Sequence, residues 1–151
     1  MSGVQRGLVL DLSCAFHAPR EQVFQALTEP AELVEWWGPS GFTTPEIEVN
    51  LHVGGSYRFG MQPPDGELFH LVGEFLEIEP PSRLAYTFRW EEPDPDDRET
   101  VVRLSLDPGP VDITELSVSQ GQFATDARWA LHEAGWTESL ARLSALIHSG
   151  T

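Results

Sequence analysis

Three side chains of this sequence could carry acid–base chemistry: His70, Glu74 and His132. Histidine titrates near neutral pH, and burial can tune a carboxyl group into the same range, so either could move a proton to or from a bound substrate. Each also has a structural interpretation, because a buried histidine can complete a hydrogen-bond network and most carboxylates form a solvated surface. No nucleophile elbow, phosphate loop or zinc-binding motif accompanies them. The residues therefore define no complete catalytic constellation.

The remaining histidines do not suggest a metal centre. His17, His52 and His148 stand apart in the sequence and show no metal-ligand spacing. We therefore expect neither a metal ion nor a cofactor.

Alternating aromatic residues form a second pattern that could bind a ligand. Tyr57 and Phe59 alternate in one predicted strand, and Tyr86, Phe88 and Trp90 alternate in another. Alternate residues of a strand share one face of the sheet, and we expect this face to point at the longest helix. Two interpretations stay open, ordinary core or the wall of a pocket, since pockets are lined mostly by apolar and aromatic side chains.

Three tryptophans extend the candidate set. Trp36 and Trp37 precede a Gly/Pro loop, and adjacent helical residues point about 100° apart. We therefore expect one of them to pack in the core and the other to line an entrance. His132 and Trp136 are four residues apart and share a face of the last predicted helix.

Gln120 and Gly135 are two other positions that we interpret from the sequence. Gln120, at the end of the last strand, is a further polar candidate. Gly135, beside Trp136, is interpreted as the point where a strand approaches the helix closely, at a cost in helix stability of about 1 kcal/mol.

The elements that must position these residues follow a simple order. A strand over 7–17 is followed by a helix that Pro19 opens and Pro30 ends, and by a short helix, Ala31–Trp36. Strand-like runs then cover 46–51, 56–61, 68–79, 84–90, 102–106 and 113–120, with a bulge expected where the pattern breaks near Gly73. Apolar residues at three- and four-residue spacing predict a long amphipathic helix over 125–147, with Thr125 as its N-cap. Segregated strands and helices predict an α+β fold with an antiparallel sheet.

Composition limits the function further. The chain has 151 residues, which fits one domain over 1–151. Its formal charge of −15 disfavours binding to nucleic acid and to anionic membrane surfaces. The single cysteine, Cys14, suits a reducing compartment as a buried, inert thiol. Without a leader-like or membrane-spanning stretch, the sequence predicts a soluble cytoplasmic protein with no membrane insertion.

Several segments resemble the family named after the activator of the heat-shock-protein-ninety ATPase, within the START-like or SRPBCC superfamily. They are residues 51–59 (LHVGGSYRF), 73–84 (GEFLEIEPPSRL) and 132–136 (HEAGW), supported by 18–28 and the Trp36–Trp37 pair. The resemblance runs from about residue 8 to 148. It implies the helix-grip fold, in which a curved antiparallel sheet of about six or seven strands wraps around a long C-terminal helix, leaving a cavity between them.

The resemblance does not imply one activity, since relatives include lipid carriers, hormone receptors and polyketide cyclases. Our first hypothesis is a carrier or sensor that binds a small apolar molecule. The alternatives are a cyclase- or hydrolase-like enzyme and a co-chaperone-like interaction module, and the chain could also form a homodimer. The expected ligand-binding residues are Trp36, Trp37, Tyr57, Phe59, His70, Tyr86, Phe88, Trp90, Gln120, His132 and Trp136.

Overall fold

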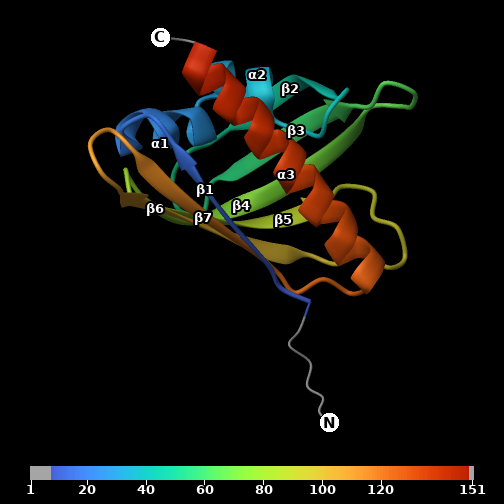
Figure 1. Cartoon of the computed structure of the whole chain (residues 1–151). Coiled ribbons are helices and arrows are strands. Elements are labelled where there is room, and N and C mark those ends of the chain that lie inside the picture. The colour runs from blue at the N-terminus through green and yellow to red at the C-terminus, as the bar shows by residue number, and fades with distance from the viewer. Residues whose placement is uncertain (1–7, 150–151) are drawn as a thin grey trace.

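The longest helix lies along the inner face of a curved antiparallel sheet (Figure 1). The computed structural model describes residues 8–149. Its elements are β1 (Leu10–Phe16), α1 (Arg20–Thr28), α2 (Pro30–Trp36), β2 (Thr43–Val49), β3 (Ser56–Gln62), β4 (Phe69–Glu79), β5 (Arg83–Trp90), β6 (Thr100–Pro108), β7 (Thr114–Gly121) and α3 (Asp126–Ser149).

The seven strands form one sheet in the order β1-β7-β6-β5-β4-β3-β2. Every neighbouring pair is antiparallel. From β2 to β7 each strand pairs with the next one along the chain, and β1 pairs with β7 at the edge of the sheet. The predicted α+β helix-grip fold is therefore confirmed.

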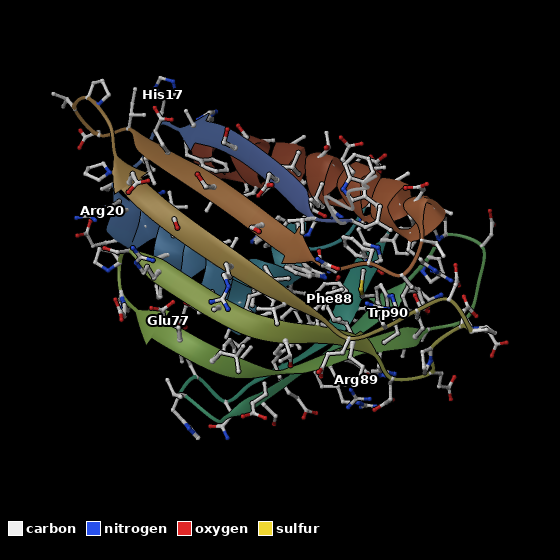
Figure 2. All side chains as sticks on the ribbon, turned by 90° about the horizontal axis from the view of Figure 1, so that it is seen from below. His17, Arg20, Glu77, Phe88, Arg89 and Trp90 are labelled. Atoms are coloured by element: carbon white, nitrogen blue, oxygen red, sulfur yellow. The ribbon has the colours of Figure 1, made fainter. Side chains whose placement is uncertain are left out.

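Alternation along each strand decides which side chains face α3. In β5, Leu84, Tyr86 and Phe88 are buried, whereas Arg89 is exposed. Figure 2 shows Arg89 on the outer face of the sheet and its neighbours Phe88 and Trp90 on the other side. One face of the sheet thus supplies the core, and the other meets solvent.

Local signals in the sequence set the limits of α3. The hydroxyl of Thr125 accepts a hydrogen bond from the backbone N–H of Arg128 at 3.1 Å, which confirms Thr125 as the N-cap. Trp136, Leu140, Leu143 and Ile147 recur at three- and four-residue spacing and are all buried. This stripe packs α3 onto the sheet.

The bulge predicted near Gly73 lies further along β4. The register of β4 and β5 shifts between Phe75 and Glu77 instead. Gly73 has another function: a Cβ atom there would lie 2.0 Å from the carbonyl oxygen of Thr87 and 2.5 Å from the ring of Tyr57. The residue must be glycine because Tyr57 crosses over it to reach β5.

Two buried tyrosines nearby differ in their hydrogen bonding. Burial raises the pKa of both phenols, so both hydroxyl groups stay protonated and able to donate. Tyr57 donates to the carbonyl oxygen of Thr87 at 2.6 Å. The hydroxyl of Tyr86 makes no hydrogen bond with any residue from 8 to 149, and burial is the only cause of its pKa shift.

We expect Tyr57→Phe to lower the free energy of unfolding by about 1–3 kcal/mol, because it leaves the Thr87 carbonyl without its partner. Tyr86→Phe removes a hydroxyl that has no partner in the described chain and should leave stability unchanged or slightly higher. Urea denaturation of the two variants tests this contrast directly. Equal losses in both would show that the Tyr57 bond contributes nothing specific.

Candidate functional site

A cavity of about 140 Å³ lies between α3, the inner face of β3–β5 and the loop after α2. Its wall is almost entirely apolar. Six of its lining residues are aromatic: Trp37, Phe42, Phe69, Phe88, Trp90 and Trp136. Leu131 also belongs to the lining and is 56% exposed, so it marks the mouth of the cavity on α3.

α3 presents two buried polar residues to the cavity, with a gap between them. His132 and Ser139 are seven residues apart, two helical turns along one face, and both line the cavity. Gly135 lies between them, and a Cβ atom built on it would meet only Pro39 Cγ, at 3.9 Å. The expected close approach of a strand at Gly135 is therefore wrong: the missing side chain leaves space for the cavity.

The ring of His132 is held by one hydrogen bond and by aromatic neighbours. Nδ1 lies 2.9 Å from the carbonyl oxygen of Arg128. The ring packs against Phe123, Phe88 and Trp90, with centroids 4.7, 5.5 and 5.9 Å away. Burial is the main influence on this group and lowers the pKa of His132, which favours the neutral ring at pH 7.

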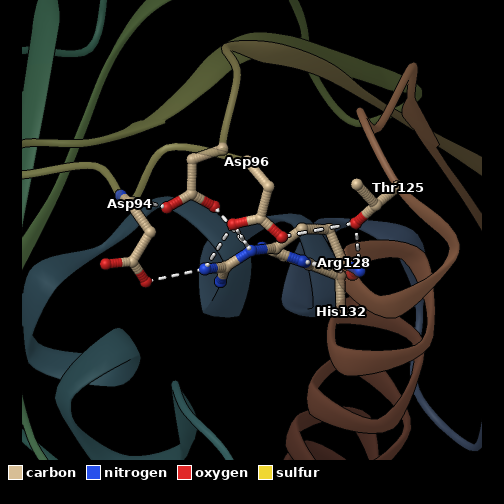
Figure 3. Close-up of polar contacts among 6 residues, drawn as sticks. Asp94, Asp96, Thr125, Arg128 and His132 are labelled. Atoms are coloured by element: carbon tan, nitrogen blue, oxygen red, sulfur yellow. Dashed lines mark hydrogen bonds and ion pairs between the residues drawn. The ribbon is translucent and has the colours of Figure 1, made fainter.

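One turn earlier on α3, Arg128 ties the helix to the loop after β5 (Figure 3). Its guanidinium group lies 2.6 Å from a carboxylate oxygen of Asp94 and 3.1 Å from one of Asp96 and one of Asp97. The hydrogen bond from Arg128 lowers the pKa of the Asp96 carboxyl group. This cluster fixes the backbone whose carbonyl orients His132.

A second arginine of α3 fixes the opposite wall. Arg142 Nη1 lies 2.9 Å from the carbonyl oxygen of Gly38, 3.2 Å from those of Pro39 and Phe42, and 3.4 Å from that of Trp37. Backbone N–H of Ser40 donates to Glu138 at 2.9 Å. α3 therefore holds the loop over residues 37–42 that closes one side of the cavity.

The two adjacent tryptophans have different positions although both are buried. Trp36 is fully buried and donates from Nε1 to the carbonyl of Ala26 at 2.9 Å. Trp37 lies past the end of α2, with extended backbone angles, and lines the cavity. Its ring contacts those of Phe59 and Trp136 at centroid distances of 5.0 and 5.6 Å.

Three of the predicted aromatic residues lie on the far side of Trp37. Tyr57, Phe59 and Tyr86 surround a separate space of about 10 Å³, which Trp37 also lines. They form core around a small void, whereas Trp37, Phe88, Trp90, His132 and Trp136 are brought together around the larger cavity.

Gln120 and His70 line neither space. Gln120 is fully buried and links two residues, since it accepts from Trp136 Nε1 at 2.7 Å and donates to Thr100 at 2.9 Å. His70 lies between the inward-facing Phe69 and Leu71 in β4, so its side chain points to the opposite face of the sheet. Its Nε2 lies 2.8 Å from a carboxylate oxygen of Glu46. It lies on the outer face, so it cannot act with His132 on one substrate.

Glu74, the third acid–base candidate, is exposed and does not line the cavity either. His132 is thus the one member of the three that does. In the described part of the chain, no group of three or more His, Cys, Asp or Glu side chains could hold a metal ion.

Sequence reasoning missed several lining residues. Phe69 could have been found, because it alternates with Leu71 in β4, and Ser139 could have been found two turns beyond His132. Phe42 lies in a loop, where the sequence has no periodic apolar pattern. Met61 and Leu131 belong to a strand and a helix whose apolar patterns core packing alone explains. Only the folded loop brings Phe42 to the cavity.

Comparison with known proteins gives a consistent result. A family model described as activator of Hsp90 ATPase homolog 1-like protein matches residues 17–148. A solved structure from Chromobacterium violaceum is 29% identical, with a TM-score of 0.83, over 92% of this chain and 96% of that one. The AHSA1 protein of Silicibacter pomeroyi is 26% identical, with a TM-score of 0.82, over 95% and 99% of the two chains.

A structure from Nitrosomonas europaea is also similar, at 26% identity and a TM-score of 0.80, over 97% of this chain and 98% of that one. No curated protein matches by sequence. Within the described residues, no helix is both long and apolar enough to cross a membrane.

Proposed function

This chain belongs to the family of activator of Hsp90 ATPase homolog 1-like proteins, and from that premise we propose that it binds a small apolar molecule in the cavity beneath α3. The role is that of a carrier or sensor. The observation that carries the proposal is the cavity itself, which six aromatic side chains line with almost no polar surface.

The size of the cavity suggests the size of the ligand. Its volume of about 140 Å³ resembles that of an engineered apolar cavity of about 150 Å³ in another protein, which stays dry and binds benzene. Pockets for drug-sized molecules are larger, about 300–1,000 Å³. We therefore propose a ligand of about one ring.

Binding is favoured over catalysis by the position of the acid–base candidates. His132 lines the cavity, while His70 and Glu74 lie elsewhere on the sheet. Of the three candidates, only His132 is therefore placed to transfer a proton to or from a molecule bound in the cavity. We also propose that the protein acts in the cytoplasm, where its half-buried Cys14 would stay reduced.

Substitution at Gly135 tests the proposal without removing a contact. Gly135→Leu should fill the cavity from the helix side and abolish stabilisation by an apolar ring such as toluene. It should also raise the free energy of unfolding by up to about 1 kcal/mol, because glycine is a poor helix former. Thermal unfolding with and without toluene measures both effects.

Gly135→Ala is the matched control. It also gains helix propensity and adds one Cβ atom at an ordinary contact distance from Pro39, so it should be more stable than the parent chain and still bind toluene. If toluene stabilises the leucine variant as much as the alanine variant, the ligand lies elsewhere and the proposal is wrong.

A further inference from the structure

The protonation of the His132 ring is fixed by its partner. A carbonyl oxygen can only accept a hydrogen bond, so the Nδ1 atom 2.9 Å from the Arg128 carbonyl must carry the proton. In the neutral ring Nε2 is then an acceptor with a free lone pair. The fold thus presents an acceptor and not a donor at this point of the wall.

No residue between 8 and 149 donates a hydrogen bond to Nε2 of His132. The residue is only 9% exposed, and Phe88, Trp90 and Phe123 surround its ring. Buried acceptors are normally satisfied, because an unmet hydrogen bond is costly. A donor supplied by a bound molecule would satisfy this one.

The rest of the lining excludes charged ligands. Neither a carboxylate nor a guanidinium group lines the cavity, since Arg128 and Arg142 are both engaged elsewhere. The hydroxyl of Ser139 is the other polar group, 6% exposed and without a hydrogen bond to any described residue, but it can rotate to donate or accept. Of these two polar groups, only Nε2 of neutral His132 requires a ligand that donates a hydrogen bond.

We propose that the ligand is a neutral ring that carries one hydrogen-bond donor, of the phenol class, and that Nε2 of His132 accepts this hydrogen bond. The inference rests on the proposed function, because it names the chemistry of the molecule bound in the same cavity. His132 thereby determines which apolar rings the protein prefers.

The test compares phenol with toluene, which has nearly the same shape but no donor. NMR titrations give the dissociation constant of each for the parent protein and for His132→Phe, which keeps the aromatic packing. The ratio of the toluene constant to the phenol constant should fall about tenfold or more in the variant. Using the ratio cancels the difference in hydration between the two compounds, as in a double-mutant cycle.

Two further variants show which group acts. His132→Gln places an amide oxygen near the position of Nε2 and should restore part of the preference for phenol. Ser139→Ala should leave the ratio unchanged. If Ser139→Ala abolishes the preference and His132→Phe does not, Ser139 recognises the donor and the assignment to His132 is wrong.

Acid pH gives an independent readout. The charged groups that face His132 are Arg128 on α3 and Asp97 in the loop after β5. Burial, together with the Arg128 charge, lowers the pKa of the ring and outweighs the raising effects of the Arg128 backbone hydrogen bond and of Asp97, so the pKa stays below its ordinary value of 6.5. Once protonated, Nε2 donates and can no longer accept. A phenol oxygen can accept a hydrogen bond from the protonated ring, so this readout uses pyrrole, whose N–H donates and which offers no acceptor. The ratio of the toluene constant to the pyrrole constant should be constant from pH 7 to 8, fall as the pH is lowered through the pKa of His132, and show no such fall in His132→Phe.

The outcomes separate this inference from the proposed function. If both compounds bind the parent protein and the ratio is the same in His132→Phe, the inference is wrong and the apolar-ligand function stands. If neither compound binds in the cavity, the proposed function and the inference fail together.

Discussion

Trp136→Ala should lower the free energy of unfolding by about 3–5 kcal/mol, because it removes a large side chain from the centre of the packing between α3 and the sheet. Trp136 is 5% exposed, and its ring meets that of Trp37. Its Nε1 also donates to the fully buried Gln120 at 2.7 Å. Urea denaturation measures the loss.

Trp136→Phe separates packing from hydrogen bonding at this position. It keeps an aromatic ring but leaves the side-chain amide oxygen Oε1 of Gln120 unsatisfied, which should cost about 1–3 kcal/mol. Adding Gln120→Leu should recover part of that loss, since the unsatisfied oxygen is then gone. If the phenylalanine variant is as unstable as the alanine variant, the hydrogen bond and not the ring volume dominates at this site.

The second large effect is expected at Arg142. Arg142→Met keeps much of the aliphatic length but removes the arginine donor from the carbonyl groups of Gly38 and Phe42. The carbonyl groups of Trp37 and Pro39 also lose it but keep the Thr44 hydroxyl and the Phe42 N–H, respectively, as donors. Hydrogen bonds from a charged group typically contribute about 1.5–3 kcal/mol, so a loss of that size is expected. Ring-sized ligands should bind about tenfold more weakly, because this loop supplies Trp37 and Phe42 to the cavity wall.

Arg58→Met is the matched control for Arg142→Met. Arg58 pairs with Glu91 on the exposed face of the sheet, where solvent screens the interaction, so its loss should change neither stability nor ligand binding appreciably. Thermal unfolding and a toluene titration on both variants make the comparison. If Arg142→Met behaves like Arg58→Met, the loop does not depend on the arginine.

Much of the fold follows from local patterns. Three- and four-residue spacing without proline places α3 correctly, and the alternation of Tyr86 and Phe88 predicts the inner face of β5. These signals work because burial of one face dictates the period of apolar residues. The same rule applied to β4 would have placed His70 on the outer face, next to the inward Phe69.

The site was less predictable because it depends on how separate segments meet. Helical geometry predicts that adjacent tryptophans diverge, yet α2 ends at Trp36 and the extended backbone at Trp37 turns both rings inward. Gly38 and Gly41 adopt positive φ angles of 107° and 88°, a backbone conformation that glycine adopts readily. The path of the folded loop requires these angles, and the sequence does not specify that path. No periodic pattern in the sequence predicts that Phe42 lines the cavity beneath α3.

The two arginines of α3 should respond differently to ionic strength. Arg128 interacts with the exposed carboxylates of Asp94 and Asp96 and with the more buried one of Asp97, and dissolved ions screen exposed charges over about 10 Å at 0.1 M salt. Arg142 interacts with backbone carbonyl dipoles, which carry no net charge for ions to screen. Rising salt should therefore loosen the start of α3 beside His132 while the loop at Arg142 stays in place, so amide hydrogen exchange would become faster at one end of the helix only.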